Sequence, residues 1–326
     1  MNYVEFCKLW DDETMTGFQL KTSGSTGEPK PILLEKKWLE YSAKQTQQTL
    51  GITSGKIFCC IPTDKVGGFM MMVRARVLGL GFEYAEPSSD PMTNLVFNHD
   101  CTFISLVPLQ LKAILENLES VQKLNRFSHI LIGGGPIDDN VVAALQTLRP
   151  AIYHTYAMTE TYSHIALRRL NGAKAQKRFY PLPNVKVQLN ESTCLQIQTQ
   201  FSALIDTTDL AHIYPDGSFE ILGRADFVIN SGGIKILPER VEKLIAESRI
   251  VPFAFVISSK PDSRLGEKVV MVCNQDTKLP LNTLQTLKKQ LPKYHNPLEI
   301  ILVTDIPHTN NGKPDRKKLK QLLSHT

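Results

Sequence analysis

The strongest constraint on the fold is an alternation of short apolar stretches with helical patterns between residues 57 and 160. Three of these stretches, rich in Ile, Leu, Val and Phe, have the length and composition of strands that are buried on both faces of a sheet. They occupy residues 57–62, 102–108 and 129–135. Residues 111–118 place their apolar side chains at the i, i+3, i+4, i+7 spacing of a helix face. Strands that alternate with helices predict a doubly wound parallel sheet in an α/β domain.

A second pattern follows this region. Residues 184–190 and 195–200 alternate polar and apolar side chains, which is typical of antiparallel strands with one buried face. Residues 211–222 place a Pro-Asp-Gly turn between two apolar stretches and therefore predict a β-hairpin. A small β region is thus expected after the parallel sheet.

A third pattern begins at about Gly223. Pro238 can open a helix, because its missing N–H and fixed φ suit the first helical turn. Another helix is predicted by the spacing of Leu281, Leu284, Leu287 and Leu291, and strand-like stretches lie around it. The sequence therefore predicts a large domain over residues 1–224 and a small α+β domain over residues 225–326.

Composition excludes several classes of protein. The chain of 326 residues is 42% hydrophobic and carries 37 Lys and Arg against 32 Asp and Glu, which indicates a folded rather than a disordered protein. Its apolar runs are much shorter than the roughly 20 residues of a membrane-spanning helix. The N-terminal residues include acids where a signal peptide carries basic residues. We therefore expect a soluble, cytoplasmic protein.

The six cysteines, at positions 7, 59, 60, 101, 194 and 273, show neither a CxxC motif nor Cys/His ligand spacing. Cysteines scattered in this way through a long chain are expected to be buried thiols rather than disulfides or zinc ligands.

Charge is distributed unevenly. Residues 223–326 hold 17 Lys and Arg against 10 Asp and Glu, whereas the rest of the chain is slightly acidic. A basic region of this kind suits an anionic partner such as a nucleotide or coenzyme A, although an ordinary solvated surface would have the same composition. No zinc knuckle and no basic stretch interleaved with aromatic residues is present, so a nucleic-acid partner is not expected.

The most specific motif is TSGSTGEPK, from Thr22 to Lys30. Its glycines let the backbone turn so that successive N–H groups can face an anion, while the hydroxyl groups and the lysine add donors and charge. The order differs from the Walker motif, in which Lys and Ser/Thr follow the second Gly directly. The residues expected to bind phosphate are Thr22, Ser23, Gly24, Ser25, Thr26, Gly27 and Lys30.

This motif resembles the signature loop of the adenylate-forming superfamily, which includes the acyl- and aryl-CoA synthetases. Further segments resemble motifs of that superfamily in the same order along the chain. They are YAMTE (156–160), TTD (207–209), GRADFVINSGGIKILPERVE (223–242) and NGKPDR (311–316). Within the superfamily, the third segment and the compact size are most similar to the o-succinylbenzoate–CoA ligases of menaquinone biosynthesis.

The resemblance implies a ligase that joins a carboxylate to AMP, releases pyrophosphate, and then transfers the acyl group to the thiol of coenzyme A. ATP would bind with Mg²⁺, and residues 22–30 would hold its β- and γ-phosphates. Thr159 would contact the α-phosphate, and Glu160 would bind the Mg²⁺. The implied adenine and ribose contacts come from Gly134, Gly135, Tyr156, Asp209 and Arg224.

The same resemblance implies that the small domain rotates between the two half-reactions. Lys313 is the implied catalytic residue that neutralises charge developing at the α-phosphate. Asp226 has the position of the hinge, and rotation there would exchange Lys313 for Gly232 and Gly233, which would line the coenzyme A channel. Without the motifs, these residues would be an exposed lysine and an ordinary β-turn.

The chain departs from the superfamily's pattern at three points. Ala157 replaces the Gly of the aromatic–Gly–x–Thr–Glu motif, and Thr208 replaces the Gly of Thr–Gly–Asp, so a backbone that needs positive φ there would be strained. Only 21 residues precede the phosphate motif, where the superfamily commonly has a whole subdomain. We therefore expect a truncated large domain with one reduced sheet, and a substrate channel that is more open or is covered by a second chain in a homodimer.

The acid pocket is the least specified part. Arg74 lies in the segment that the superfamily places near the acyl group, where a second carboxylate on the substrate would favour a cation. The same segment also fits a buried helix whose Arg74 and Arg76 side chains reach the surface. Ser163 and His164 follow the YAMTE motif and could donate hydrogen bonds to an aryl acid, although a structural histidine fits equally well.

Three functions remain open at this point. The first is an acid–CoA ligase acting on o-succinylbenzoate. The second is an adenylating enzyme for another acid or for a carrier protein. The third is a nucleotide-binding relic without activity, against which the intact charged motif residues argue.

Overall fold

The structure is a computed structural model, and it describes residues 1–21, 30–93, 95, 101–309 and 313–324. The chain divides into two compact units. The first consists of Met1–Val187, Ile197–Ile205 and Ile213–Phe219, and the second of Gln188–Gln196, Asp206–His212 and Glu220–Thr326. The division into domains at residues 224 and 225 stays a prediction.

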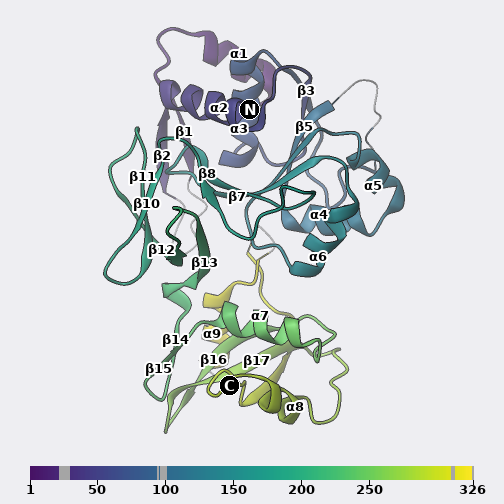
Figure 1. Cartoon of the computed structure of the whole chain (residues 1–326), viewed down its shortest axis with the longest axis vertical. Helices are drawn as coiled ribbons and strands as arrows, with labels where there is room; N and C mark the ends of the chain where they lie inside the picture. Colours follow the sequence, from purple (N-terminus) through teal and green to yellow (C-terminus); the bar gives the residue numbers. More distant parts are fainter. Residues whose placement is uncertain (22–29, 94, 96–100, 310–312, 325–326) are drawn as a thin grey trace. The chain divides into compact units, whose positions relative to one another are not determined.

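The first unit contains a seven-stranded sheet in the order β4-β3-β5-β6-β7-β8-β9 (Figure 1). The strands from β4 to β7 pair in parallel, whereas β8 pairs antiparallel with β7 and β9. The strands are β3 (Lys56–Cys59), β4 (Gly81–Tyr84), β5 (Cys101–Leu106), β6 (His129–Ile132), β7 (Ala151–Met158), β8 (Ser163–Arg169) and β9 (Tyr180–Pro181). The three apolar stretches are β3, β5 and β6, and the predicted α/β fold class is confirmed.

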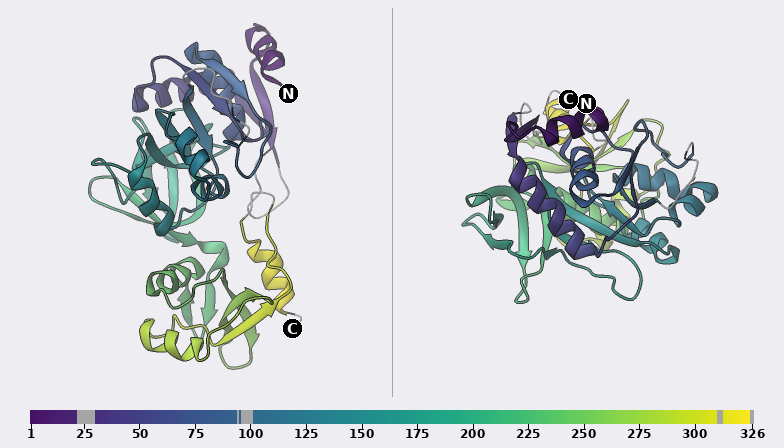
Figure 2. Two further views of the ribbon diagram at one scale, coloured as in Figure 1. Left: turned by 90° about the vertical axis from the view of Figure 1, so that its right-hand side faces the viewer. Right: turned by 90° about the horizontal axis from the view of Figure 1, so that it is seen from above.

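Helices cover both faces of this sheet, and Figure 2 shows them from two further directions. Phe58 of β3 packs in a cluster with Leu111 of α4, while its neighbour Ile57 packs in a different cluster with Met71 of α3. Burial of both faces explains why these strands are rich in large apolar residues. The helices are α2 (Lys36–Leu50), α3 (Val66–Leu78), α4 (Pro108–Leu115), α5 (Leu118–Leu124), α6 (Asp139–Ala144) and the 3-10 helix η1 (Leu145–Thr147).

The N-terminal segment adds helix α1 (Tyr3–Asp11) and a two-stranded antiparallel sheet of β1 (Gly17–Lys21) and β2 (Pro31–Glu35). A capping box starts α1, because Asn2 and Glu5 each accept a hydrogen bond from the other's backbone N–H. Phe6 and Trp10 of α1 pack in one aromatic cluster with Phe18 of β1 and Phe69 of α3.

A four-stranded sheet in the order β10-β11-β12-β13 follows, and its residues are divided between the two units. It confirms the β region that the alternating pattern predicts. In the expected Pro-Asp-Gly turn, the N–H of Tyr214 donates to the carbonyl of Ser218 at 2.8 Å. The strands are β10 (Lys186–Leu189), β11 (Cys194–Gln198), β12 (Ile205–Ile213) and β13 (Phe219–Arg224).

The second unit contains a five-stranded sheet with the path β15-β14-β17-β16, in which β18 also pairs with β17. Val241 of α7 packs on one side with Met271, whereas Leu319 of α9 packs with Val270, the adjacent residue of β17. The elements are η2 (Ala225–Phe227), β14 (Ile229–Ser231), β15 (Ile234–Ile236), α7 (Pro238–Ser248), β16 (Val256–Asp262), β17 (Gly266–Asn274), α8 (Thr283–Gln290), β18 (Glu299–Val303) and α9 (Arg316–Ser324).

One helix prediction is partly wrong. Helix α8 begins at Thr283, so Leu281 lies outside it and is 94% exposed. Asn282 takes a left-handed conformation with φ = 66°, and Pro280 precedes it. A helix cannot continue through a left-handed residue, so the four-leucine spacing overestimates its length.

Among the cysteines whose side chains are described, Cys59, Cys60, Cys194 and Cys273 are buried, Cys7 is partly buried, and all are free thiols. Burial raises the pKa of Cys59 and of Cys273 to about 11, so both stay protonated at neutral pH. In the described ranges no helix is both long and apolar enough to cross a bilayer.

Candidate active site

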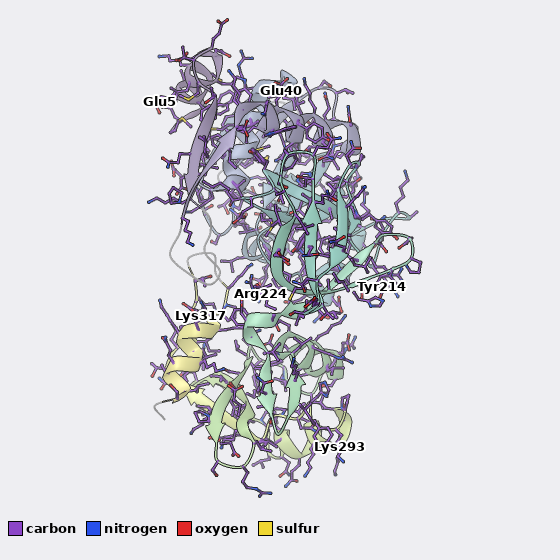
Figure 3. The ribbon with its side chains drawn as sticks, turned by 90° about the vertical axis from the view of Figure 1, so that its left-hand side faces the viewer. Glu5, Glu40, Tyr214, Arg224, Lys293 and Lys317 are labelled. Carbon is purple, nitrogen blue, oxygen red and sulfur yellow. The ribbon has the colours of Figure 1, made fainter. Side chains whose placement is uncertain are left out.

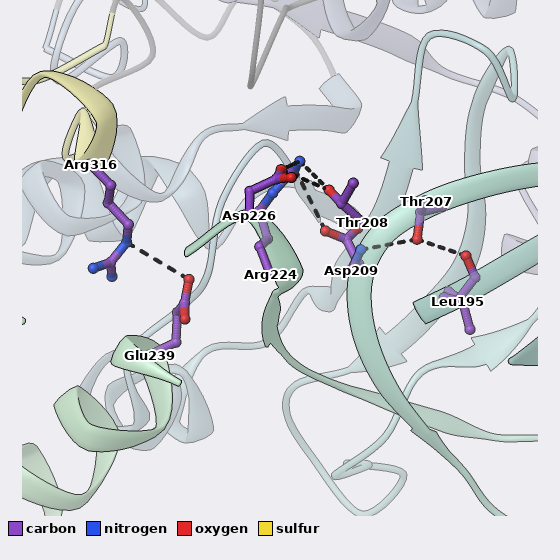
Figure 4. Close-up of polar contacts among 8 residues, drawn as sticks. All are labelled: Leu195, Thr207, Thr208, Asp209, Arg224, Asp226, Glu239 and Arg316. Carbon is purple, nitrogen blue, oxygen red and sulfur yellow. Dashed lines mark hydrogen bonds and ion pairs between the residues drawn. The ribbon is translucent and has the colours of Figure 1, made fainter. Parts of the chain in front are cut away.

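The TTD segment and the residues after β13 form a charged network in the second unit (Figure 4). Arg224 ends β13 (Figure 3), and its Nη2 pairs with Asp226 at 2.7 Å while its Nη1 lies 3.7 Å from Asp209. The hydroxyl of Thr208 donates to Asp226 Oδ2 at 3.0 Å and accepts from Arg224 Nη2. The structure thus brings together Asp209 of the TTD segment with Arg224 and Asp226 of the segment 223–242.

Neighbouring threonines hold this network in different ways. Thr207 is buried, and its hydroxyl donates to the carbonyl of Leu195 at 2.7 Å and accepts from the N–H of Asp209 at 3.1 Å. Because side chains alternate along a strand, Thr208 points to the other face, toward Arg224. Neither Thr208 nor Ala157 has a positive φ, so the two replacements of glycine cause no strain of that kind.

Lys313 is electrostatically coupled to the same network. The N–H of Thr309 donates to the Lys313 carbonyl at 2.7 Å, which fixes the backbone before α9. The side chain keeps exposed surface, yet desolvation lowers the pKa of Lys313, the positive charge of Arg224 lowers it further, and Asp209 opposes both effects. Residues 310–312 of the NGKPDR motif lie outside the described residues.

The glycine pair forms the turn between β14 and β15. Gly232 and Gly233 have φ values of 57° and 82°, which is the pattern of a two-residue hairpin turn with positive φ at both central positions. The N–H of Gly232 donates to the carbonyl of Leu265 at 2.8 Å. The β-turn is therefore confirmed, while a role in the coenzyme A channel stays a prediction.

The YAMTE motif spans the end of β7 and the turn into β8, in the first unit. The ring of Tyr156 packs edge-on against Phe219 at 5.5 Å and at a tilt against Phe179 at 6.0 Å. Thr159 is buried, and its carbonyl accepts from the N–H of Tyr162 at 3.0 Å. Glu160 is half-buried in this turn. The ring of Tyr156 and the carboxylate of Glu160 thus come from one short segment of the chain.

The glycine segment that follows β6 meets a residue that sequence reasoning missed. The carbonyl of Gly135 lies 2.9 Å from Nε2 of His154, and Arg168 Nη2 lies 3.4 Å from its Nδ1. Since arginine only donates, Nδ1 must accept and Nε2 must donate to Gly135. His154 and Tyr156 are two residues apart on β7 and so share a face, which is the signal that could have found His154. Gly134, with φ = 85°, lies exposed in this segment.

Arg74 is the least expected feature, because it is buried and only 2% of its surface is exposed. Its Nε donates to the Thr46 hydroxyl at 3.2 Å, and its Nη2 donates to the Ser163 hydroxyl at 2.8 Å. Among the described residues, its Nη1 donates only to the sulfur of Met71, at 3.9 Å, which is a weak acceptor. The expectation that this arginine reaches the surface is wrong, whereas Arg76 does so and pairs with Asp11.

Within the described part of the chain, no carboxylate pairs with Arg74. Burial lowers the pKa of its guanidinium to about 9, so the charge persists at neutral pH. A buried cation without a counter-charge costs free energy, which is typical of a site that awaits an anion. Ser163 adds to this cost, because its φ of 141° is strained for a residue other than glycine.

His164 completes this cluster as a neutral group. Its Nδ1 lies 3.4 Å from Arg74 Nη2 and its Nε2 lies 3.3 Å from the Thr46 hydroxyl, so Nδ1 accepts and Nε2 donates. Burial, and then the charge of Arg74, lower its pKa well below the ordinary value. The structure brings Arg74, Ser163 and His164 together as predicted candidates, and it adds Thr46, which no motif indicated.

The phosphate motif lies outside the described residues except for Lys30, which is exposed. Over the residues that are described, no three His, Cys, Asp or Glu side chains lie close enough to hold a metal ion by themselves.

Comparisons with known proteins agree with this arrangement. A family model described as AMP-binding enzyme matches residues 16–196. The 2-succinylbenzoate–CoA ligase of Enterococcus faecalis is 25% identical over 96% of this chain and 70% of that protein. The acyl-CoA synthetase (AMP-forming)/AMP-acid ligase II-like protein of Dyadobacter fermentans is 32% identical, with a TM-score of 0.64 over 98% of this chain and 93% of that one.

The fold also matches the o-succinylbenzoate coenzyme A synthetase of Bacillus subtilis, solved in complex with ATP and magnesium ion. That structure is 21% identical and has a TM-score of 0.78 over 92% of this chain and 69% of that one. The family model covers more than half of the sequence, and the Dyadobacter protein is similar over nearly its whole length. The chain therefore belongs to the family of AMP-binding enzymes.

Proposed function

We propose that this protein is an ATP-dependent acid–CoA ligase that forms an acyl-adenylate and then a coenzyme A thioester, with o-succinylbenzoate as the acid. The observation that carries the choice of acid is the buried, charged Arg74, with which no carboxylate of the described residues pairs. o-Succinylbenzoate has two carboxylates, so one can be activated while the other needs a counter-charge. The relatives named 2-succinylbenzoate–CoA ligase support this assignment.

The acid would approach Arg74 from the side of Nη1. Nη1 donates to the sulfur of Met71, whose flexible side chain is readily displaced. Ser163 and His164 hold the other edge of the guanidinium, so the donors of Nη1 keep a fixed direction. The strained turn at Ser163 thus positions the group that receives the second carboxylate.

The nucleotide would be held by Tyr156, Gly134 and Gly135 at adenine, and by Asp209 and Arg224 at ribose. Attack of the carboxylate on the α-phosphate brings two anions together, so positive charge and aligned donors are needed there. Thr159 and Lys313 would supply them, together with the phosphate motif at residues 22–30. Bound Mg²⁺ would add positive charge across the phosphate oxygens.

The two half-reactions need different groups at the acyl phosphate. We assign Asp226 as the hinge, the domain boundary to residues 224 and 225, and the turn of Gly232 and Gly233 to the coenzyme A channel. These assignments rest on the motifs and stay predictions, and so do a cytoplasmic location and a homodimer.

The charge state of Lys313 gives a testable pH dependence. Adenylate formation needs the ammonium form, and the pKa of Lys313 lies below its ordinary value. The group is therefore protonated below that lowered pKa and loses its charge as pH rises through it, earlier than an exposed lysine would. We expect single-turnover adenylate formation to fall in this alkaline range, and Lys313→Arg to move the fall to higher pH. A fall at the same pH in both proteins would assign it to another group.

Glu160→Gln should weaken the productive use of Mg·ATP and leave the fold intact. The change keeps the shape of the side chain and removes the charge that binds the metal. We expect the Mg²⁺ concentration for half-maximal pyrophosphate release to rise about tenfold, as one charged ligand is lost. Glu191→Gln, at an exposed turn residue, is the control. An unchanged Mg²⁺ requirement would remove Glu160 from the metal site.

The proposed function is tested by pyrophosphate release from ATP with a panel of aryl and acyl acids, with and without coenzyme A. A ligase releases pyrophosphate only when its acid is present and forms a thioester only when coenzyme A is added. Pyrophosphate release without a thioester product would favour an enzyme that loads a carrier protein. ATP binding without turnover on any acid would favour the relic.

A further inference from the structure

Thr208 is the residue of the charged network that departs from the superfamily's Thr–Gly–Asp motif, which has a glycine at this position. A hydroxyl has one proton to donate, and Thr208 donates it to Asp226 Oδ2 at 3.0 Å. The hydroxyl oxygen of Thr208 also accepts a hydrogen bond from Arg224 Nη2, and this Nη2 donates in addition to Asp226 Oδ2 at 2.7 Å. Hydroxyl, guanidinium and carboxylate therefore close a triangle, which a glycine at position 208 could not form.

The triangle determines the direction of the rest of the guanidinium. Arg224 is planar, with five donors in a fixed arrangement, so fixing Nη2 also fixes Nη1. Nη1 then faces Asp209, at 3.7 Å. The side chains of Arg224, Asp209 and Asp226 are 25%, 17% and 27% exposed, so water screens these interactions only partly.

Without the Thr208 hydroxyl, the guanidinium of Arg224 would lie between the carboxylates of Asp209 and Asp226. Fewer contacts would then fix its orientation. Nη1 would then lose its fixed direction beside Asp209, the residue assigned to the ribose. Phe227, 5.8 Å from the guanidinium, restrains the body of the side chain but cannot fix the rotation of its donors.

We propose that Thr208 is a positioning residue for nucleotide binding, which holds Arg224 to Asp226 and thereby fixes the direction in which Arg224 Nη1 faces Asp209 at the expected ribose site. The proposal rests on the proposed function only in taking ATP as the ligand. Thr208 contacts neither phosphate nor acid in this role, and it acts through Arg224.

The test is the dissociation constant of ATP, measured by calorimetry on the full chain with Mg²⁺ and without acid or coenzyme A. Thr208→Val removes the hydroxyl at nearly constant shape and should weaken ATP binding about tenfold, as expected for hydrogen bonds to charged groups. Thr208→Ser keeps the hydroxyl and should bind ATP like the wild type. Thr286→Val is the matched control, because it removes a hydroxyl that donates to the carbonyl of Asn282, the residue before α8.

A second readout separates positioning from general stability. In turnover, Thr208→Val should raise KM for ATP, leave KM for the acid unchanged, and leave the melting temperature of the protein near that of the wild type. Combining Thr208→Val with Asp226→Ala should weaken ATP binding by less than the product of the two single effects, because both remove the same link. A fully multiplicative loss would contradict that link.

The proposal is overturned if Thr208→Val binds ATP like the wild type, or if Thr208→Ser is as defective as Thr208→Val. It is also overturned if the wild type does not bind ATP. A wild-type protein that binds ATP but activates no acid would contradict the proposed ligase function. The ATP affinities of the position 208 variants would still decide the role of Thr208.

Discussion

Lys313→Ala is expected to slow acyl-adenylate formation by about 10²–10³-fold, the usual cost of removing one positioned charge at a developing oxyanion. The structure supports this role, because Lys313 is coupled electrostatically to Asp209 and Arg224, which we assign to the nucleotide. The same variant should form the coenzyme A thioester from supplied acyl-adenylate at close to the wild-type rate. The two rates are measured separately, by pyrophosphate release in single turnover and by thioester formation.

Lys318→Ala provides the control for this experiment. Lys318 also lies near the start of α9, but its side chain is 70% exposed and pairs only with Asp315. A surface pair of this kind contributes little, so both half-reactions should be unchanged. Equal losses of both half-reactions in Lys313→Ala, with a normal melting transition, would contradict the assignment of Lys313 to adenylation.

Arg74→Met is expected to lower kcat/KM for o-succinylbenzoate by about 10²–10³-fold, because breaking a buried charge pair costs about 3–5 kcal/mol. The ligand-free protein should be as stable as the wild type or more stable, since the change removes a buried cation that no described carboxylate neutralises. Loss of activity without loss of stability would distinguish a binding residue from a structural one. The measurements are steady-state kinetics and the melting temperature.

Two controls define the specificity of this effect. Arg76→Met changes an exposed arginine on the same helix, which pairs with Asp11 at the surface, and should leave kcat/KM unchanged. 4-Oxo-4-phenylbutanoate has the chain of o-succinylbenzoate but lacks the ring carboxylate, so Arg74→Met should use it about as well as the wild type does. If Arg74→Met loses activity equally with both acids, Arg74 does not bind the second carboxylate.

The elements of the fold were largely predictable because their signals are local. The stretches that become β3, β5 and β6 are rich in large apolar residues, which pack on both faces of the sheet. Helix α8 shows the limit of such reasoning. The leucine spacing extends back to Leu281, but a left-handed Asn282 starts the helix later, and spacing alone carries no information on that backbone conformation.

The candidate site was predictable only in part, because its groups meet through the tertiary fold. The YAMTE and TTD motifs indicated Tyr156 and Asp209, because each motif is a short continuous stretch of sequence that can be recognised without knowing the tertiary fold. Burial of Arg74 could not be inferred, because Thr46 and Ser163 reach it from other elements, α2 and β8. Thr208 looked like a simple replacement of glycine, and its bond to Asp226 emerges only where β12 meets the end of β13.

The central claim is tested most directly by incubating the protein with ATP, Mg²⁺, coenzyme A and o-succinylbenzoate, and identifying the products by mass spectrometry. We predict AMP, pyrophosphate and o-succinylbenzoyl-CoA in equal amounts, no thioester when ATP is omitted, and much less thioester from Arg74→Met. A wild-type protein that binds ATP but forms no acyl-adenylate or thioester from o-succinylbenzoate, while another acid supports both, would contradict the assignment.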